Sequence, residues 1–172
     1  VRNVALSAEL SQFRNLPVQR NFPELIAGAT LNEGVYASRM RAADDGALFP
    51  GSWKADRTQL LLGGQVDLSS ALSLIDASLA FEAAGQWVDN LPDTNDERIG
   101  RQGNWGAATP PGGSCQAVTQ QTQGGCKVDG FATDFSWGYR LFATISLPRP
   151  ARGIDLYPLL GWNHDVQGYA VD

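Results

Sequence analysis

The chain has 172 residues, enough for one ordinary domain, and its formal net charge at pH 7 is −5. A surplus of carboxylates without a basic cluster argues against a nucleic-acid partner, because phosphate binding needs concentrated lysine and arginine. Charged residues make up only 18% of the chain, whereas its 19 glycines and 5 tryptophans favour β-structure with many turns. The sequence has no run of about 18 apolar residues, which excludes a spanning helix but leaves a β-barrel open.

The first predicted element is a strand over about residues 3–13. Val4, Leu6 and Leu10 alternate there with polar residues such as Glu9, a period of two that is typical of a strand with one apolar and one polar face. The strand begins at the very start of the sequence with no signal peptide before it. We therefore expect processing or fragmentation to have removed the true beginning.

A long connection, 14–53, follows the first predicted strand. Its segment 23–29 predicts a short helix, because Pro23 suits the first helical turn. A polar tract at 39–46 comes next. We expect the connection as a whole to be a surface excursion.

Two further strands are predicted at about 56–68 and 74–88, with a short turn between them. Leu60 in the first and Phe81 in the second lie on apolar faces, whereas Glu82 lies on a polar one. Two strands joined so closely are expected to pair in antiparallel fashion.

The second long connection, 89–131, begins with an acidic stretch. Its carboxylates are Asp89, Asp93, Asp96 and Glu97. Carboxylates in one loop can gather calcium, but the Asp-x-Asp-x-Asp-Gly spacing of a calcium loop is absent. A solvated acidic loop is the simpler interpretation.

The same connection holds the two cysteines of the chain, Cys115 and Cys126, in a stretch rich in glycine, proline and glutamine. Two cysteines and one histidine do not make a zinc site, whereas a close pair in a polar loop suits a disulfide formed in an oxidising compartment. We predict a Cys115–Cys126 disulfide and a location outside the cytoplasm. Two free thiols are the alternative.

The last two predicted strands cover about 132–147 and 154–166. The first of them shows the clearest alternation, with Trp137 and Leu141 on its apolar face. Pro158 weakens the second, because proline cannot donate a hydrogen bond to a ladder.

Long and short connections alternate strictly between these strands, as they do in outer-membrane barrels with tight periplasmic turns and long external loops. We therefore predict an all-β fold, namely a porin-like antiparallel transmembrane β-barrel of the bacterial outer membrane, with the whole chain belonging to one barrel domain. Bacterial barrels have an even number of strands, at least eight. The five strands predicted here are therefore expected to be part of a larger barrel.

Four aromatic residues lie where the predicted strands cross the outer rim of the membrane. They are Trp87, Trp137, Tyr139 and Trp162. Aromatic rings collect at headgroup depth because they are amphipathic, so we predict an interfacial girdle. The alternative is that they are core aromatics of a soluble sandwich.

The polar faces of the strands predict the lining of a lumen. The predicted lining residues are Glu9, Arg57, Gln59, Gln65, Asp67, Asp76, Glu82, Gln86, Asp134 and Arg140. Charges of both signs on such a face can pair across neighbouring strands or line a wet path for solutes.

Candidate catalytic chemistry is sparse. His164 next to Asp165 suggests a base with an orienting carboxylate, but a catalytic serine would need a Gly-x-Ser-x-Gly elbow, and the sequence has none. We interpret His164 as an exposed histidine at a strand end, and we expect no enzyme activity, no cofactor and no metal ligand.

Several phrases of the sequence resemble one known family. They are Ala8-Glu9-Leu10-Ser11, Pro17-Val18-Gln19, Asp56-Arg57-Thr58-Gln59-Leu60, Phe135-Ser136-Trp137-Gly138-Tyr139-Arg140-Leu141, and Pro158 with Trp162-Asn163-His164-Asp165-Val166-Gln167-Gly168-Tyr169. In this order they resemble the later part of the proteobacterial outer-membrane family labelled "domain of unknown function 1302". The resemblance spans nearly the whole chain, and the last two phrases are its most specific part.

The resemblance implies a large porin-like barrel of which this chain is an internal stretch. Members of the family are associated with the handling of hydrophobic compounds, often beside a periplasmic lipid-binding-like partner and an exporter of the resistance-nodulation (RND) type. Those two proteins, together with outer-membrane lipid and lipopolysaccharide, are the partners it implies. It carries over no catalytic residue.

We expect a passive channel or transport component for hydrophobic, lipid-like or small solutes, with loops that gate the outer mouth of a polar lumen. One alternative is a secreted soluble β-sandwich that binds a ligand. A second is a barrel-borne hydrolase similar to the outer-membrane lipases.

Overall fold

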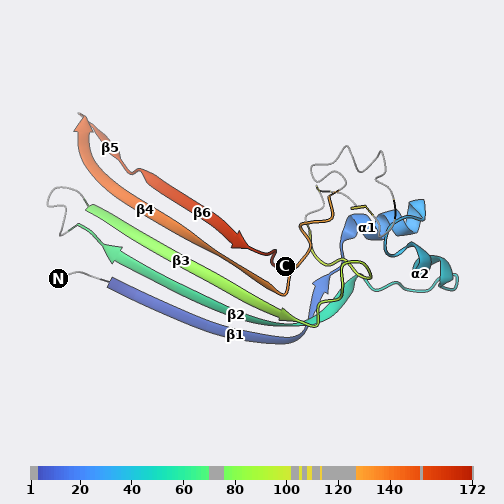
Figure 1. Ribbon diagram of the computed structural model, residues 1–172. Coiled ribbons are helices and arrows are strands. Elements are labelled where there is room, and N and C mark those ends of the chain that lie inside the picture. The colour runs from blue at the N-terminus through green and yellow to red at the C-terminus, as the bar shows by residue number, and fades with distance from the viewer. Residues whose placement is uncertain are drawn as a thin grey trace. The chain divides into compact units, whose positions relative to one another are not determined.

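The computed structural model describes residues 4–69, 76–101, 105, 108–109, 113, 127–151 and 153–171. Their strands are β1 (Val4–Gln19), β2 (Ser52–Asp67), β3 (Asp76–Asp89), β4 (Phe135–Ala151), β5 (Ile154–Leu156) and β6 (Leu159–Gln167). They form one six-stranded antiparallel sheet, in which β1 to β4 lie side by side in chain order and β4 pairs with both β5 and β6 (Figure 1). The predicted all-β antiparallel class is confirmed.

The strand ends differ from the predicted ones mainly because β1 and β4 run further into the connections that follow them. Strand β1 continues to Gln19 past Asn15, whose φ of 53° lies in the left-handed region, and the Asn15 amide donates to the Asp56 carboxylate at 2.7 Å. Strand β4 likewise continues to Ala151, beyond the predicted end at 147. Strand-like backbone therefore replaces part of what the sequence suggested was loop.

Pro158 divides the fifth predicted strand. Residues 154–166, expected as one strand, form β5 and β6 with Tyr157 and Pro158 between them. Proline has no amide proton to donate, but its carbonyl still accepts a hydrogen bond from the Ile145 amide at 3.1 Å. Pairing with β4 therefore continues on both sides of the break.

The chain divides into two compact units. The first, which we call the sheet unit, comprises 1–12, 58–86 and 136–167, and the second, the connection unit, comprises 13–57, 87–135 and 168–172. The connection unit has a hydrophobic core. Its buried members are Val18, Ala55, Val88, Ile99 and Val171, with Leu16, Trp53, Leu91 and Ala132 packed against them.

Three short helical segments belong to the connection unit: α1 (Phe22–Ile26), the π-helix η1 (Ala27–Leu31) and α2 (Ala37–Ala42). The Asn21 side chain caps α1 by accepting a hydrogen bond from the Glu24 amide at 3.1 Å, and Pro23 occupies the first turn. The short helix predicted at 23–29 is thus confirmed. No helix in the described ranges has the length and apolar character needed to cross a membrane.

Candidate functional site in the two faces of the sheet unit

Contacts between neighbouring strands show which side chains share a face of the sheet unit. A Cβ atom added at Gly64 in β2 would meet both the Leu6 side chain of β1 and the Phe81 ring of β3. On the opposite face, the Ser78 and Thr144 hydroxyls lie 2.5 Å apart. Since successive residues of a strand point to opposite sides, these contacts assign the remaining positions.

One face of the sheet unit carries no charged residue at any strand position whose side chain the structure describes, and we call it the charge-free face. Its larger residues are Val4, Leu6, Leu10, Leu60, Leu62, Val66, Leu79, Phe81, Trp137, Tyr139, Leu141, Ile145, Leu147, Leu156, Leu160, Trp162 and His164. Many are strongly exposed, with 76% exposure at Leu6, 72% at Leu10 and 60% at Trp162. An apolar surface this continuous and this exposed is unusual for a soluble domain.

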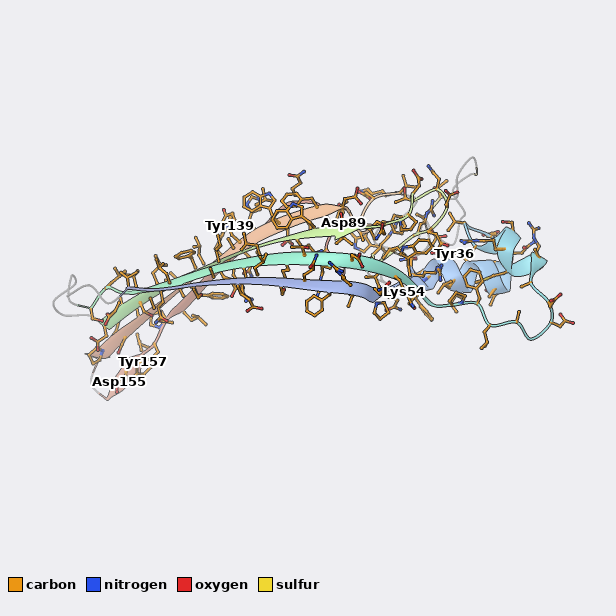
Figure 2. All side chains as sticks on the ribbon, turned by 90° about the horizontal axis from the view of Figure 1, so that it is seen from below. Tyr36, Lys54, Asp89, Tyr139, Asp155 and Tyr157 are labelled. Carbon is orange, nitrogen blue, oxygen red and sulfur yellow. The ribbon has the colours of Figure 1, made fainter. Side chains whose placement is uncertain are left out.

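Aromatic side chains gather at one level of the charge-free face. The β4–β6 register places Tyr139 opposite His164 and Leu141 opposite Trp162. The Tyr139 and His164 rings meet edge to face with their centroids 5.4 Å apart, and the Tyr139 hydroxyl lies 3.4 Å from His164 Nδ1. Figure 2 shows side chains leaving both sides of the strands, with Tyr139 on one side of β4.

The opposite face, which we call the polar face, carries the charged side chains that the structure describes in the strands of the sheet unit. Glu82 of β3 and Arg140 of β4 form an ion pair there at 2.5 Å, with their side chains 33% and 52% exposed. Neighbouring strands therefore place opposite charges within pairing distance, as the sequence predicted.

Arginines and carboxylates form a buried ionic network in the connection unit. Glu97 accepts from Arg20 at 2.7 Å and from Arg39 at 2.5 Å. Burial by itself raises the pKa of Glu97, but the hydrogen bonds and positive charges of the two arginines outweigh burial, so its net pKa lies below the usual range. The Glu97 carboxylate is therefore held ionised inside the connection unit.

A second part of this network joins Glu24, Tyr36 and Arg98. Arg98 donates to the Glu24 carboxylate at 2.5 Å, and the Tyr36 hydroxyl both donates to the Arg98 carbonyl at 2.9 Å and accepts from the Arg98 amide at 3.0 Å. Burial raises the pKa of the Tyr36 hydroxyl to about 12. Gly34, whose φ is +83°, lies against Glu24, where a Cβ would come within 2.6 Å of the carboxylate.

The network corrects the prediction that both long connections are surface excursions. Glu97 and Arg98 of the second connection are buried against Arg20, Glu24 and Tyr36 of the first. The prediction of a solvated acidic loop fits Asp89, Asp93 and Asp96, which are exposed, but it is wrong for Glu97, which is buried. Among the described residues there is no group of three or more histidines, cysteines or carboxylates that could hold a metal ion.

A comparison with protein-family models identifies a family for this chain. The model described as "Protein of unknown function (DUF1302)" matches residues 1–172, the whole chain. The chain belongs to this family. No curated protein and no solved structure matches the chain.

The predicted aromatic group of this DUF1302 chain is divided between the two units. Trp137, Tyr139 and Trp162 share the charge-free face of β4 and β6. Trp87 belongs to the connection unit, where its ring packs against Phe135 with their centroids 5.2 Å apart.

The predicted lining residues of the DUF1302 chain also divide between the two units. Glu9, Gln59, Gln65, Asp67, Asp76, Glu82, Gln86 and Arg140 lie in the sheet unit, whereas Arg57 and Asp134 lie in the connection unit. The Arg57 guanidinium stacks over the Phe13 ring at 4.9 Å, and Gln86 is buried rather than open to a lumen. Among the predicted lining residues, all of which the structure describes, Glu82 and Arg140 form an ion pair across neighbouring strands.

His164 and Asp165 do not form a catalytic pair in this DUF1302 chain. They are successive residues of β6 and so point to opposite faces of the sheet. His164 meets Tyr139 on the charge-free face, whereas the Asp165 carboxylate lies 3.1 Å from where a Cβ of Gly138 would be, on the polar face. The carboxylate therefore does not orient the imidazole.

Cys115 and Cys126 lie outside the described residues, so their disulfide stays a prediction. In contrast, the structure adds Phe142, which sequence reasoning left out of both faces: the register opposite Gly161 places it on the polar face beside Arg140. The period of two along β4 would have assigned Phe142 to the polar face from the sequence alone.

Proposed function

We propose that the sheet unit is part of a transmembrane β-barrel in the bacterial outer membrane, and that the protein is a passive channel or transport component. The charge-free face is the observation that carries the proposal. A barrel strand must present apolar side chains to lipid and polar ones to the lumen, and a charge near the bilayer midplane would be destabilising by about 2–4 kcal/mol. Where the structure describes the side chains of these strands, the charged ones are confined to the other face.

The exposure of this face favours a barrel over a soluble β-sandwich. In a sandwich, the apolar face of one sheet is buried under a second sheet about 10 Å away. Here the described strands belong to a single sheet, and Leu10, Leu160 and Trp162 on its charge-free face are strongly exposed. Lipid would cover these side chains in a membrane.

The aromatic group supports a particular depth of β4 and β6 in the membrane. Trp137, Tyr139 and Trp162 combine an apolar ring with a polar atom, so they are most stable where hydrocarbon meets headgroups. The proposal places that level of β4 and β6 at a rim of the apolar band. Outer-membrane lipid and lipopolysaccharide are then the surroundings of the charge-free face.

Solute passage would follow the polar face, where ionised side chains keep a wet path open. Membership of the DUF1302 family supports hydrophobic, lipid-like or small solutes as cargo, with a periplasmic lipid-binding-like protein and an RND-type exporter as partners. A barrel needs at least eight strands. The proposal therefore requires that the full-length protein supplies the strands that close it.

Fractionation of the full-length protein, followed by reconstitution, tests this function. We expect the protein in the outer-membrane fraction, extractable only with detergent and with heat-modifiable migration on a gel. Liposomes that contain it should swell in isotonic solutions of small sugars, whereas liposomes without protein should not. A protein that is soluble in plain buffer would favour the β-sandwich instead, and an outer-membrane protein without swelling activity would contradict the conduit.

A further inference from the structure

Among its described side chains, the charge-free face holds one that can become positively charged near neutral pH. It is His164, the single histidine of the chain, which β6 places directly opposite Tyr139 of β4. Histidine is the residue type whose protonation ordinarily changes between about pH 5 and 8. The His164 side chain is exposed, so a ligand can contact it. A face that is otherwise neutral at its described side chains therefore acquires a positive charge as the pH falls.

The described surroundings of His164 do not neutralise this charge. In the part of the sheet that the structure describes, β6 pairs with β4, and the titratable group that β4 places against His164 is Tyr139. The nearest carboxylate in the sequence, Asp165, lies on the polar face, on the other side of the β6 backbone. The positive charge of a protonated His164 is therefore available to a partner molecule.

Tyr139 and two tryptophans add hydrogen-bond donors at the same level. The Tyr139 hydroxyl lies 3.4 Å from His164 Nδ1. When His164 is protonated, both ring nitrogens donate, so Nδ1 can donate to the Tyr139 oxygen while the hydroxyl proton and the Nε2 proton remain for an anion. The indole N–H groups of Trp137 and Trp162 on this face can only donate. A positive charge among donors is the complement of an anion rich in acceptor oxygens.

We propose that protonated His164, together with the Tyr139 hydroxyl, binds the phosphate of an anionic lipid headgroup. This inference rests on the proposed function, which places the aromatic level where hydrocarbon meets headgroups. Lipid phosphates lie at that depth, and their oxygens accept charge-assisted hydrogen bonds. A zwitterionic headgroup carries its own cation beside its phosphate and so attracts His164 less. The chemistry of the site therefore selects a lipid with net negative charge.

Quenching of Trp162 fluorescence by brominated lipids tests the proposal. Trp162 lies two residues from His164 on the same face, about 7 Å along β6, and is 60% exposed. The full-length protein is reconstituted in mixed vesicles of phosphatidylcholine and phosphatidylglycerol, with one or the other brominated. The signal of Trp162 is the difference from the same protein with Trp162→Phe. Comparing the two vesicle types gives the relative association of the two lipids at this site.

We expect a preference for phosphatidylglycerol that depends on pH. It should be about fivefold at low pH, the effect of about one cation near an anionic membrane surface. The preference should be lost between about pH 5 and 8, as histidine gives up its proton. The phosphodiester of phosphatidylglycerol keeps one negative charge over this range, so the change comes from the protein. Soluble inorganic phosphate, added at constant ionic strength, should not compete.

Matched variants assign the preference to residues. His164→Phe keeps an aromatic ring and should show no preference at either end of the pH range, whereas His164→Lys should show it at both ends. Tyr139→Phe should weaken the preference at low pH. Leu147→Ala, on the same face of β4 but away from the aromatic level, should leave the preference unchanged. Heat-modifiable migration reports whether each variant has folded.

The outcomes separate this inference from the proposed function. If neither brominated lipid quenched Trp162, the charge-free face would not face lipid, and the barrel itself would be contradicted. Equal quenching by the two lipids at every pH, a preference that His164→Phe retains or His164→Lys lacks, or one that inorganic phosphate abolishes would overturn the lipid-phosphate site. Each of these results would leave the barrel standing.

Discussion

Replacing Leu79 by arginine puts a charge on the charge-free face in the middle of the sheet. Leu79 lies on β3 three residues before Glu82, whose partner Arg140 is adjacent to Tyr139 at the aromatic level. At roughly 3.3 Å per residue, Leu79 is about 10 Å along the strand from that level. It therefore lies well inside an apolar band about 25 Å tall, where an arginine destabilises a barrel by about 2–4 kcal/mol.

The control removes a charge from the other face of the same strand. Glu82→Gln breaks the ion pair with Arg140, but both side chains are partly exposed, so the change should be destabilising by at most about 1 kcal/mol. Urea unfolding of the full-length protein folded into lipid vesicles, followed by tryptophan fluorescence, gives both differences on one scale. Equal free energies of unfolding for Leu79→Arg and Glu82→Gln would refute the assignment of the two faces.

Three further predictions concern the long connections. Tyr36→Phe removes the hydroxyl that hydrogen-bonds to both backbone groups of Arg98. The Arg98 carbonyl keeps its hydrogen bond from the Asn21 amide, but the Arg98 amide loses its acceptor, and hydrogen exchange in the connection unit should show a loss of about 1–3 kcal/mol. The pKa of folded Glu97 lies below its usual 4.5, so the stabilisation that its ionised carboxylate provides is present above pH 4.5 and is lost as the pH falls further. Limited proteolysis should show this loss in the wild type, whereas the Glu97→Gln variant should show no such pH dependence. Identical pH profiles for the two proteins would count against the ionised network. Mass spectrometry of unreduced peptides should link Cys115 to Cys126, and two thiols open to alkylation would disprove the disulfide.

The sheet was predictable because its signal is local. Alternation with a period of two requires only neighbouring residues, so Leu141 and Arg140 could be assigned to opposite faces before any pairing was known. The same rule assigns Phe142 to the polar face, but a search for polar residues on that face passes over it because its side chain is apolar. The division of the last strand at Pro158 was also visible as a weakness in the pattern.

The connection unit was not predictable in the same way. Glu97 looks like one more carboxylate in an acidic loop, and its burial depends on Arg20 and Arg39, which are far away in the sequence. Such pairs carry no periodic signal, because neither partner alone shows that the other is near. The hydrogen bonds between Tyr36 and the backbone of Arg98 depend in the same way on packing between two segments.

A spin-label scan along β4 tests most directly whether lipid covers the charge-free face. Single cysteines are introduced at positions 139 to 144 of a full-length protein in which Cys115 and Cys126 are replaced by serine, and each is labelled with a nitroxide. Collisions of the nitroxide with oxygen report exposure to lipid, and collisions with a nickel chelate report exposure to water. At positions 141 and 143 oxygen collisions should dominate, at 140, 142 and 144 nickel collisions should dominate, and position 139 at the rim should lie between the two. Labels at 141 and 143 that are shielded from both reagents would show a packed protein core, and a membrane-spanning role for this sheet would be contradicted.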